Sequence, residues 1–352
     1  MTALSWPGVL GPLLAGADLP VGAVRWAMGE VLAGEATPAQ IAGFAIALRA
    51  KGETAAELGA LVDAMLAVAT PLPLTPGPCL AAGATLVDTC GTGGDRSGTV
   101  NLSTMAALVV AGAGAVVVKH GGRGATSQTG SADLVEALGI PLTLHPRAVA
   151  RCVADAGIGF CFAPAFHPAM RHAAPARREL GVPTFFNIIG PLANPARPQA
   201  QLVGVADARL AALVAGVLAA RGTSALVVHG GDGLDELTLS GPTRVWEVRD
   251  GLVTEASVQP GDVGLGTAPV AALVGGDATH NAGVTRDLLA GRLGGPVRDA
   301  VLLNAAAALV AARPGGSALL PRLREGLASA RAALADGAAQ DALERWVTVA
   351  QA

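Results

Sequence analysis

The sequence predicts an α/β protein with a small all-helical N-terminal domain and a large domain built on a central, mostly parallel sheet flanked by helices. The chain has 352 residues, which at roughly 150 residues per domain favours two domains. Residues 1–70 show only helical patterns, whereas the remainder alternates short apolar strands with helices. Apolar residues make up 51% of the chain and charged residues 14%, which suits a large core and excludes a disordered chain or a coiled coil.

The helical domain is predicted from its capping signals and apolar faces. The first helix is recognised by apolar residues on one face, namely Val24, Met28, Val31 and Leu32. Thr37 and Gln40 form a capping box around Pro38, and Thr54 with Glu57 caps the next helix. A stiff connector follows, with prolines at positions 71, 73, 76 and 78. We therefore expect the helical domain to span residues 1–72 and the α/β domain to span residues 79–352.

Beyond the connector the pattern is that of a sheet with helical crossovers. Strands are predicted at residues 85–88, 115–119, 158–162, 201–205, 225–229 and 244–248. Helices are predicted between them at residues 103–113, 131–138, 168–180 and 207–220, and again from about residue 285. Strands that are buried on both faces and joined by helices form a largely parallel sheet.

Several features indicate a cytoplasmic protein that does not cross a membrane. The uncharged run 97–118 is long enough to span a bilayer, but its early polar residues and Gly112-Ala113-Gly114 predict a buried helix and then a buried strand. The N-terminus lacks the basic segment of a signal peptide. The four cysteines show no C-x-x-C spacing, which argues against a zinc ribbon or a disulfide framework. The net charge of −3 argues against a nucleic-acid partner.

Two glycine-rich loops follow successive strand candidates, and they would be adjacent if these strands are neighbours in the sheet. The first runs from Cys90 to Thr99 and has three glycines in four residues, just before a helix that begins near Asn101. Backbone N–H groups in such a loop, together with the helix N-terminus, bind anions. The second loop follows Lys119 and His120, and it carries Arg123, Thr126 and Ser127. Ligands of such sheets bind beyond the carboxyl ends of the strands, so the two loops suit a ligand with two phosphate groups.

A pair of carboxylates is predicted at the same edge of the sheet. Asp235 and Glu236 follow the strand candidate that ends at His229. Hard divalent cations are held by one or two carboxylates together with phosphate oxygens and water. The pair therefore predicts a magnesium site beside the phosphate loops.

Taken together, the motifs resemble those of the anthranilate phosphoribosyltransferase family, over about residues 6–346. The matching segments are Gly91-Thr92-Gly93-Gly94-Asp95, Asn101-Leu102-Ser103-Thr104, Lys119-His120-Gly121, Gly130-Ser131-Ala132-Asp133, the run 187–195 and Gly233-Leu234-Asp235-Glu236. The resemblance implies a tryptophan-pathway pentosyltransferase that uses phosphoribosyl pyrophosphate and anthranilate, with an active site between the two domains. It also implies that helices from about residues 168–196 join the helical domain, that the protein is a homodimer, and that each active site holds two Mg²⁺ ions.

The same resemblance implies roles for individual residues. The donor loop would use Gly91, Gly94, Asp95 and Thr99. The phosphates would be held by Asn101, Leu102, Ser103, Thr104, Lys119, His120, Gly121, Gly122, Arg123, Gly124, Ala125, Thr126 and Ser127, with Ser131 nearby. The metal positions would be Ser103, Asp235 and Glu236. Arg177 would receive the anthranilate carboxylate, Gly91 and Gly122 would border the acceptor, and no residue is assigned as a general acid or base.

The sequence departs from the family pattern on the acceptor side. The family has an asparagine that contacts the acceptor amine where this chain has Gly122, and it often has two histidines where this chain has Phe166-His167. Two alternatives therefore stay open. One is a relative that uses another aromatic acceptor, and the other is a non-catalytic, nucleic-acid-binding paralogue, against which the net charge and the acidic pair both count.

Overall fold

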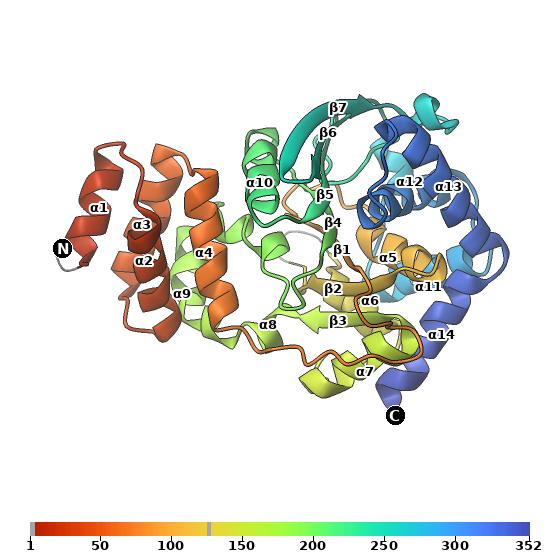
Figure 1. Ribbon diagram of the computed structural model, residues 1–352, viewed down its shortest axis with the longest axis horizontal. Coiled ribbons are helices and arrows are strands. Elements are labelled where there is room, and N and C mark those ends of the chain that lie inside the picture. The colour runs from red at the N-terminus through yellow and green to blue at the C-terminus, as the bar shows by residue number, and fades with distance from the viewer. Residues whose placement is uncertain (1–3, 125–127) are drawn as a thin grey trace.

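A computed structural model describes residues 4–124 and 128–352. A group of N-terminal helices stands beside a larger α/β domain (Figure 1). The helices of this group are α1 Trp6–Leu14, α2 Val21–Ala33, α3 Pro38–Lys51 and α4 Ala55–Ala67. Both predicted capping boxes are present at the starts of α3 and α4. Helix α1 is absent from the prediction because its two glycines and two prolines weaken the helical pattern.

The large domain contains a seven-stranded sheet in the order β3-β2-β1-β4-β5-β6-β7. Its strands are β1 Leu86–Gly91, β2 Val116–Gly121, β3 Ile158–Phe162, β4 Ala200–Gly204, β5 Ser224–Gly230, β6 Thr243–Arg249 and β7 Leu252–Val258. The first five strands are parallel, and β6 and β7 are antiparallel. The prediction of a mostly parallel sheet in an α/β fold is confirmed.

The strand boundaries differ from the prediction in a way that matters for the site. Strands β1 and β2 continue to Gly91 and Gly121, so both glycine loops start directly at the carboxyl edge of the sheet. The sequence did not predict β7, because this edge strand is mostly exposed and lacks a buried apolar face.

Helices cover both faces of the sheet. The α-helices after the connector are α5 Leu102–Gly112, α6 Ser131–Ala137, α7 Pro146–Ala156, α8 Ala163–Phe166, α9 Ala174–Leu180, α10 Ala208–Ala220, α11 Ala278–Leu289, α12 Gly295–Ala312, α13 Leu319–Ala335 and α14 Ala338–Gln351. Helices α5 and α12 pack against one face, and α7 and α10 pack against the other. The predicted single helix at residues 168–180 is a 3₁₀ turn, Pro168–His172, followed by α9.

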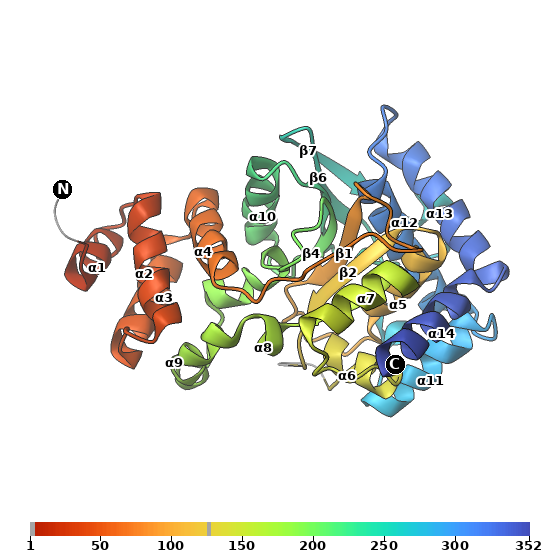
Figure 2. The same ribbon diagram turned by 60° about the horizontal axis from the view of Figure 1, so that its bottom comes forward.

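The helical group shares its core with one face of the sheet. Phe44 of α3 and Leu61 of α4 belong to the same buried cluster as Val203 of β4 and Val214 of α10. Helix α9 packs against α3, as both ribbon views show (Figure 2). The helical group is thus joined to the sheet by continuous apolar packing.

One helix in the described part of the chain, α12, is long and apolar enough to cross a membrane. It is 67% buried within the protein, where it packs against α5, α13 and the sheet. Helix α12 is therefore the central helix of the larger core. The uncharged run at residues 97–118 forms α5 and the start of β2, as predicted.

Candidate active site

The carboxyl ends of β1 and β2 and the loop after β5 that carries Asp235 and Glu236 line a cavity of about 320 Å³. Most of the site residues predicted from the sequence line this cavity: Gly91, Gly94, Asp95, Thr99, Asn101, Leu102, Ser103, Lys119, Gly121, Gly122, Arg123, Gly124, Ser131, Asp235 and Glu236. Thr104, His120 and Arg177 are not among its lining residues. Ala125, Thr126 and Ser127 lie outside the described residues.

The loop after β1 has a backbone shape that depends on glycine. Gly93, Gly94 and Gly98 have φ angles of 65°, 88° and 65°, a left-handed conformation that costs other residues free energy. The N–H of Gly93 donates to Oδ2 of Asp235 at 2.7 Å. The loop then leads into α5, whose first residues, Leu102 and Ser103, line the cavity. The N-terminal end of this helix dipole gives the cavity a positive potential.

The loop that carries Asp235 and Glu236 lies against Gly91 and Gly204, and neither glycine has space for a side chain. A Cβ at Gly91 would lie 2.2 Å from Oδ2 of Asp235, and a Cβ at Gly204 would lie 1.5 Å from the Asp235 carbonyl oxygen. Both glycines are the last residues of their strands and are register partners. The sheet edge therefore fixes the position of Asp235 within the cavity.

The cavity brings together three carboxylates, those of Asp95, Asp235 and Glu236. Burial and the neighbouring Asp95 carboxylate raise the pKa of Asp235 to about 6. Burial and the Asp235 carboxylate raise the pKa of Glu236 well above its usual value, although the charge of Lys119 opposes this rise. A divalent cation would stabilise the ionised form of both side chains.

The donor set fits magnesium held jointly by protein and substrate. The cavity offers the carboxylates of Asp235 and Glu236 and the hydroxyl of Ser103, all of them hard oxygen ligands. Among residues 4–124 and 128–352, no group of three or more His, Cys, Asp or Glu side chains is arranged to hold a metal. A magnesium ion here would therefore complete its shell with phosphate oxygens and water.

Lys119 lies beneath the cavity floor and is only 2% exposed. Its ammonium donates to the carbonyl oxygen of Thr89 and, at 3.1 Å, to Oγ of Ser103. Lys119 thus orients Ser103 and contributes positive charge from below. The sequence identified the residue but not these contacts, because Thr89 and Ser103 reach it only through the pairing of β1 with β2 and the packing of α5.

The described part of the loop after β2 is organised by Asp133 of α6. The Asp133 carboxylate accepts the N–H groups of Gly130 at 2.8 Å and Gly124 at 3.0 Å, and it forms an ion pair with Arg123 at 2.7 Å. Burial alone would raise the pKa of Asp133, but these three donors lower it below its usual value. Sequence reasoning placed Asp133 in a matching motif without giving it a role. The sequence signal for this role is the position of Asp133 three residues after Gly130, which is the spacing of a capping box.

The ion pair of Arg123 also changes its predicted role. Besides Asp133, Arg123 pairs with Glu136 at 2.9 Å, and its side chain is 53% exposed. A phosphate would therefore have to compete with two carboxylates for this guanidinium. Gly122 beside it has open space with respect to the described residues, since a Cβ there would meet none of their atoms within 4 Å.

The remaining predicted residues do not line the cavity. His120 is buried, with Nδ1 3.2 Å from the Gly190 carbonyl oxygen and its ring against that of His167 at 5.1 Å. Thr104 is buried within α5. Arg177 is exposed on α9, and its guanidinium lies over the Phe186 ring at 5.1 Å. The cavity is also lined by Asn187, which sequence reasoning had quoted only as part of a motif.

Comparisons with known proteins agree with this geometry. Residues 83–340 match the glycosyl transferase family, a/b domain, and residues 8–69 match the glycosyl transferase family, helical bundle domain. An anthranilate phosphoribosyltransferase from Salinispora arenicola is 56% identical over 348 residues, covering 99% of this chain and 97% of the relative.

Solved structures give the same result. The anthranilate phosphoribosyltransferase of Thermus thermophilus superposes with a TM-score of 0.89 at 44% identity, covering 98% of this chain and 99% of that one. The Saccharomyces cerevisiae enzyme, solved in complex with PRPP and Mg, gives a TM-score of 0.88 at 26% identity and covers 98% of each chain. With high identity along nearly its whole length, the chain belongs to the anthranilate phosphoribosyltransferase family of glycosyl transferases.

Proposed function

We propose that this protein transfers the phosphoribosyl group of 5-phosphoribosyl 1-pyrophosphate to the amine of anthranilate. The products are N-(5-phosphoribosyl)anthranilate and pyrophosphate, a step of tryptophan biosynthesis. The observation that carries the proposal is the meeting of two glycine loops and an acidic pair in one cavity, in a chain that belongs to this family.

The geometry of the cavity suits the breaking of the bond between ribose C1 and pyrophosphate. As this bond breaks, positive charge develops on the ribose and negative charge on the leaving group. Residues of both glycine loops and of the start of α5 line the cavity, and the positive end of the α5 dipole would favour the phosphate groups there. Lys119 adds a fixed positive charge below them, where burial keeps water from screening it.

Ser103, Asp235 and Glu236 would hold magnesium, with two ions per active site. Magnesium bound there would offset the charge of the pyrophosphate and help it to depart. The hydrogen bonds of Lys119 to Ser103 and of Gly93 to Asp235 keep two of these ligands in place. Asp235 and Glu236 act in this proposal as ligands and not as an acid or a base.

The acceptor would enter beside Gly91 and Gly122, with Arg177 receiving its carboxylate. A guanidinium binds a carboxylate through two parallel hydrogen bonds. Anthranilate supplies the amine nucleophile, so the protein needs no nucleophile of its own. Because Arg177 lies on α9, which packs against α3, acceptor binding would involve the segment 168–196 that we assign to the helical domain.

The test is the double substitution Asp235→Asn and Glu236→Gln, followed by the loss of anthranilate fluorescence. We expect turnover to fall by at least about a thousandfold at any magnesium concentration, since a bound cation supplies several kcal/mol of transition-state stabilisation. Asp341→Asn with Glu344→Gln, an exposed acidic pair on α14, is the matched control and should keep full activity. Near-normal turnover of the first variant at low magnesium would overturn the metal assignment.

A second candidate function is transfer to a different aromatic acceptor. The specific observation is Gly122, which leaves open space among the described residues at the position where the resemblance implies an asparagine. The donor side of the cavity is the same for both functions. Comparing anthranilate with ring-substituted analogues as acceptors distinguishes them.

We also propose that the protein is a cytoplasmic homodimer formed through the helical domain. Support comes from large apolar side chains that are exposed there, including Leu14 at 80% and Val21 at 40%. Burial of such side chains stabilises an interface. Sedimentation equilibrium should show a dimer, and Leu14→Glu should shift it toward the monomer.

A further inference from the structure

A second cavity, of about 280 Å³, lies at the seam between the helical group and the sheet. Asp63 and Leu66 of α4 form one wall, and the amino ends of β4 and β5 form the other. The active site lies at the opposite, carboxyl ends of these parallel strands. The seam cavity is therefore separate from the site of phosphoribosyl transfer.

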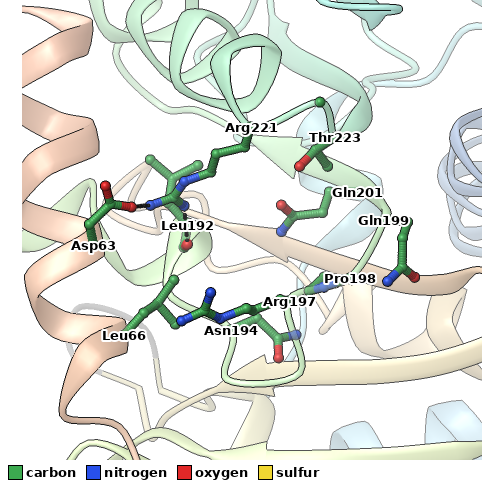
Figure 3. Close-up of a pocket in the computed structure, with 11 residues that line it drawn as sticks. Asp63, Leu66, Leu192, Asn194, Arg197, Pro198, Gln199, Gln201, Arg221 and Thr223 are labelled. Carbon is green, nitrogen blue, oxygen red and sulfur yellow. Dashed lines mark hydrogen bonds and ion pairs between the residues drawn. The ribbon is translucent and has the colours of Figure 1, made fainter.

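Two arginines of the α/β domain reach into this cavity toward α4, as Figure 3 shows. The guanidinium of Arg221 donates to Asp63 at 2.8 Å and to the Leu192 carbonyl oxygen at 2.9 Å. The guanidinium of Arg197 makes no hydrogen bond or ion pair with any of the described residues. Arg197 also has a φ of 47°, a left-handed conformation that is uncommon for a residue other than glycine.

The charges around the cavity do not balance. Asp63 is the sole carboxylate in its described lining, and it pairs with Arg221 and also with Arg25 at 2.9 Å. Arg25 and Arg221 thus share one carboxylate, and Arg197 has no carboxylate partner among the described residues. An anion in the cavity would supply the missing negative charge, and guanidinium groups bind carboxylates and phosphates well.

The rest of the lining indicates what kind of anion would fit. Leu66, Leu192 and Pro198 supply apolar surface. The hydroxyl of Thr223 lines the cavity without a hydrogen bond to the described residues, so it is free to donate to an anion. An apolar wall beside charged groups suits a ligand with an apolar body and one anionic end.

We propose that the seam cavity binds a small monocarboxylate with an apolar body, its carboxylate held between Arg197 and Arg221 and its body against Leu66 and Pro198. Such a ligand would compete with the Asp63 carboxylate for the guanidinium of Arg221. Substitutions of Arg197 and of Asp63 should therefore act in opposite directions.

The experiment is a calorimetric titration of the full-length protein with 3-phenylpropionate. Arg197→Gln should weaken binding about tenfold or more, because it removes a charge-assisted contact. Asp63→Asn should strengthen binding severalfold, because it releases Arg221 and removes a repelling charge. Arg147→Gln, which alters an exposed arginine outside the cavity, should leave binding unchanged. The uncharged 3-phenylpropionamide should not bind.

Three results would overturn the proposal. The first is no binding to the unaltered protein, and the second is binding that neither Arg197→Gln nor Asp63→Asn changes, which would place the probe in the acceptor site. The third is binding of inorganic phosphate at least as tight as that of 3-phenylpropionate, because the apolar wall would then have no role. Circular dichroism of each variant confirms that it is folded.

Discussion

Gly204 lies so close to the loop that carries Asp235 and Glu236 that even a methyl side chain at position 204 would displace this loop. In Gly204→Ala the new methyl group would lie 1.5 Å from the Asp235 carbonyl oxygen, so the backbone at Asp235 must move. We expect kcat/KM to fall by at least about a hundredfold, since small displacements of catalytic groups are costly. The control is Gly283→Ala on α11, an exposed position where the methyl group meets none of the described residues within 4 Å. Equal activity of the two variants in initial-rate assays would contradict this account.

Gly122 marks the point where the chain departs from its family, and the structure shows that a larger residue fits there. Its φ is not positive, and a Cβ would meet no atom of the described residues within 4 Å. We expect Gly122→Asn to raise kcat/KM for anthranilate a few-fold, chiefly through a lower KM, because one hydrogen bond contributes about 0.5–1.5 kcal/mol net. Asparagine also restricts the loop more than glycine does. A severalfold fall would show instead that Gly122 serves another acceptor.

At the scale of residues, the sequence predicted the site residues that belong to contiguous motifs. Asp235, Glu236 and the glycines of both loops all line the cavity. The sequence could not predict that Lys119 points to Ser103 or that Arg123 is paired with Asp133 and Glu136. Those contacts depend on the packing of separate elements, which no local pattern encodes.

At the scale of elements, the described part of the loop between β2 and α6 is held by one carboxylate, that of Asp133. Asp133→Asn removes the ion pair with Arg123 and weakens acceptance of the two glycine N–H groups. We expect KM for phosphoribosyl pyrophosphate to rise about tenfold, with a smaller effect on KM for anthranilate, since hydrogen bonds to charged groups contribute roughly 1.5–3 kcal/mol. Glu136→Gln alters only the exposed contact with Arg123 and should change KM less than about twofold. A similar rise in both variants would indicate that Arg123, and not the loop backbone, is the sensitive group.

The elements that escaped prediction share a physical cause. Strand β7 is exposed along most of its length, and α1 carries glycine and proline within its turns. Both are determined by neighbours in space, β6 for the strand and α3 for the helix. Elements with buried faces or capping boxes, such as α3, α4 and β1, were predictable because their own residues carry the signal.

At the scale of the whole molecule, ion pairs cross the seam between the helical group and the sheet. Arg49 of α3 lies 3.4 Å from Asp207, which caps α10 and also binds Arg209 at 2.7 Å. The hydrogen bonds from Arg209, against the opposing effect of burial, lower the pKa of Asp207 to about 2. Because the folded pKa is below the unfolded value, this carboxylate stabilises the fold above about pH 4, and the contribution is lost as the pH falls toward 2.

We therefore expect Asp207→Asn to lower the free energy of unfolding by roughly 1 kcal/mol at pH 7, after allowance for solvent screening. Asparagine keeps the helix cap, so the variant isolates the charge. The difference from the unaltered protein, measured by urea unfolding, should shrink between pH 4 and pH 2. Glu255→Gln, in an exposed pair with Arg244, is the control and should have no measurable effect. A pH-independent difference for Asp207→Asn would contradict the electrostatic origin.

The hydrogen bond between Gly93 and Asp235 joins residues 142 positions apart in the chain. We expect its two partners to come together only after β1, β4 and β5 have paired, so that this edge of the sheet is among the last parts of the molecule to form. Contacts of such long sequence separation form slowly, because loop closure must precede them. During refolding, helical circular dichroism should return first, in α2 to α4 and in α12, while phosphoribosyl transfer returns only with the slowest phase. A newly made chain would thus gain most of its secondary structure well before it gains activity.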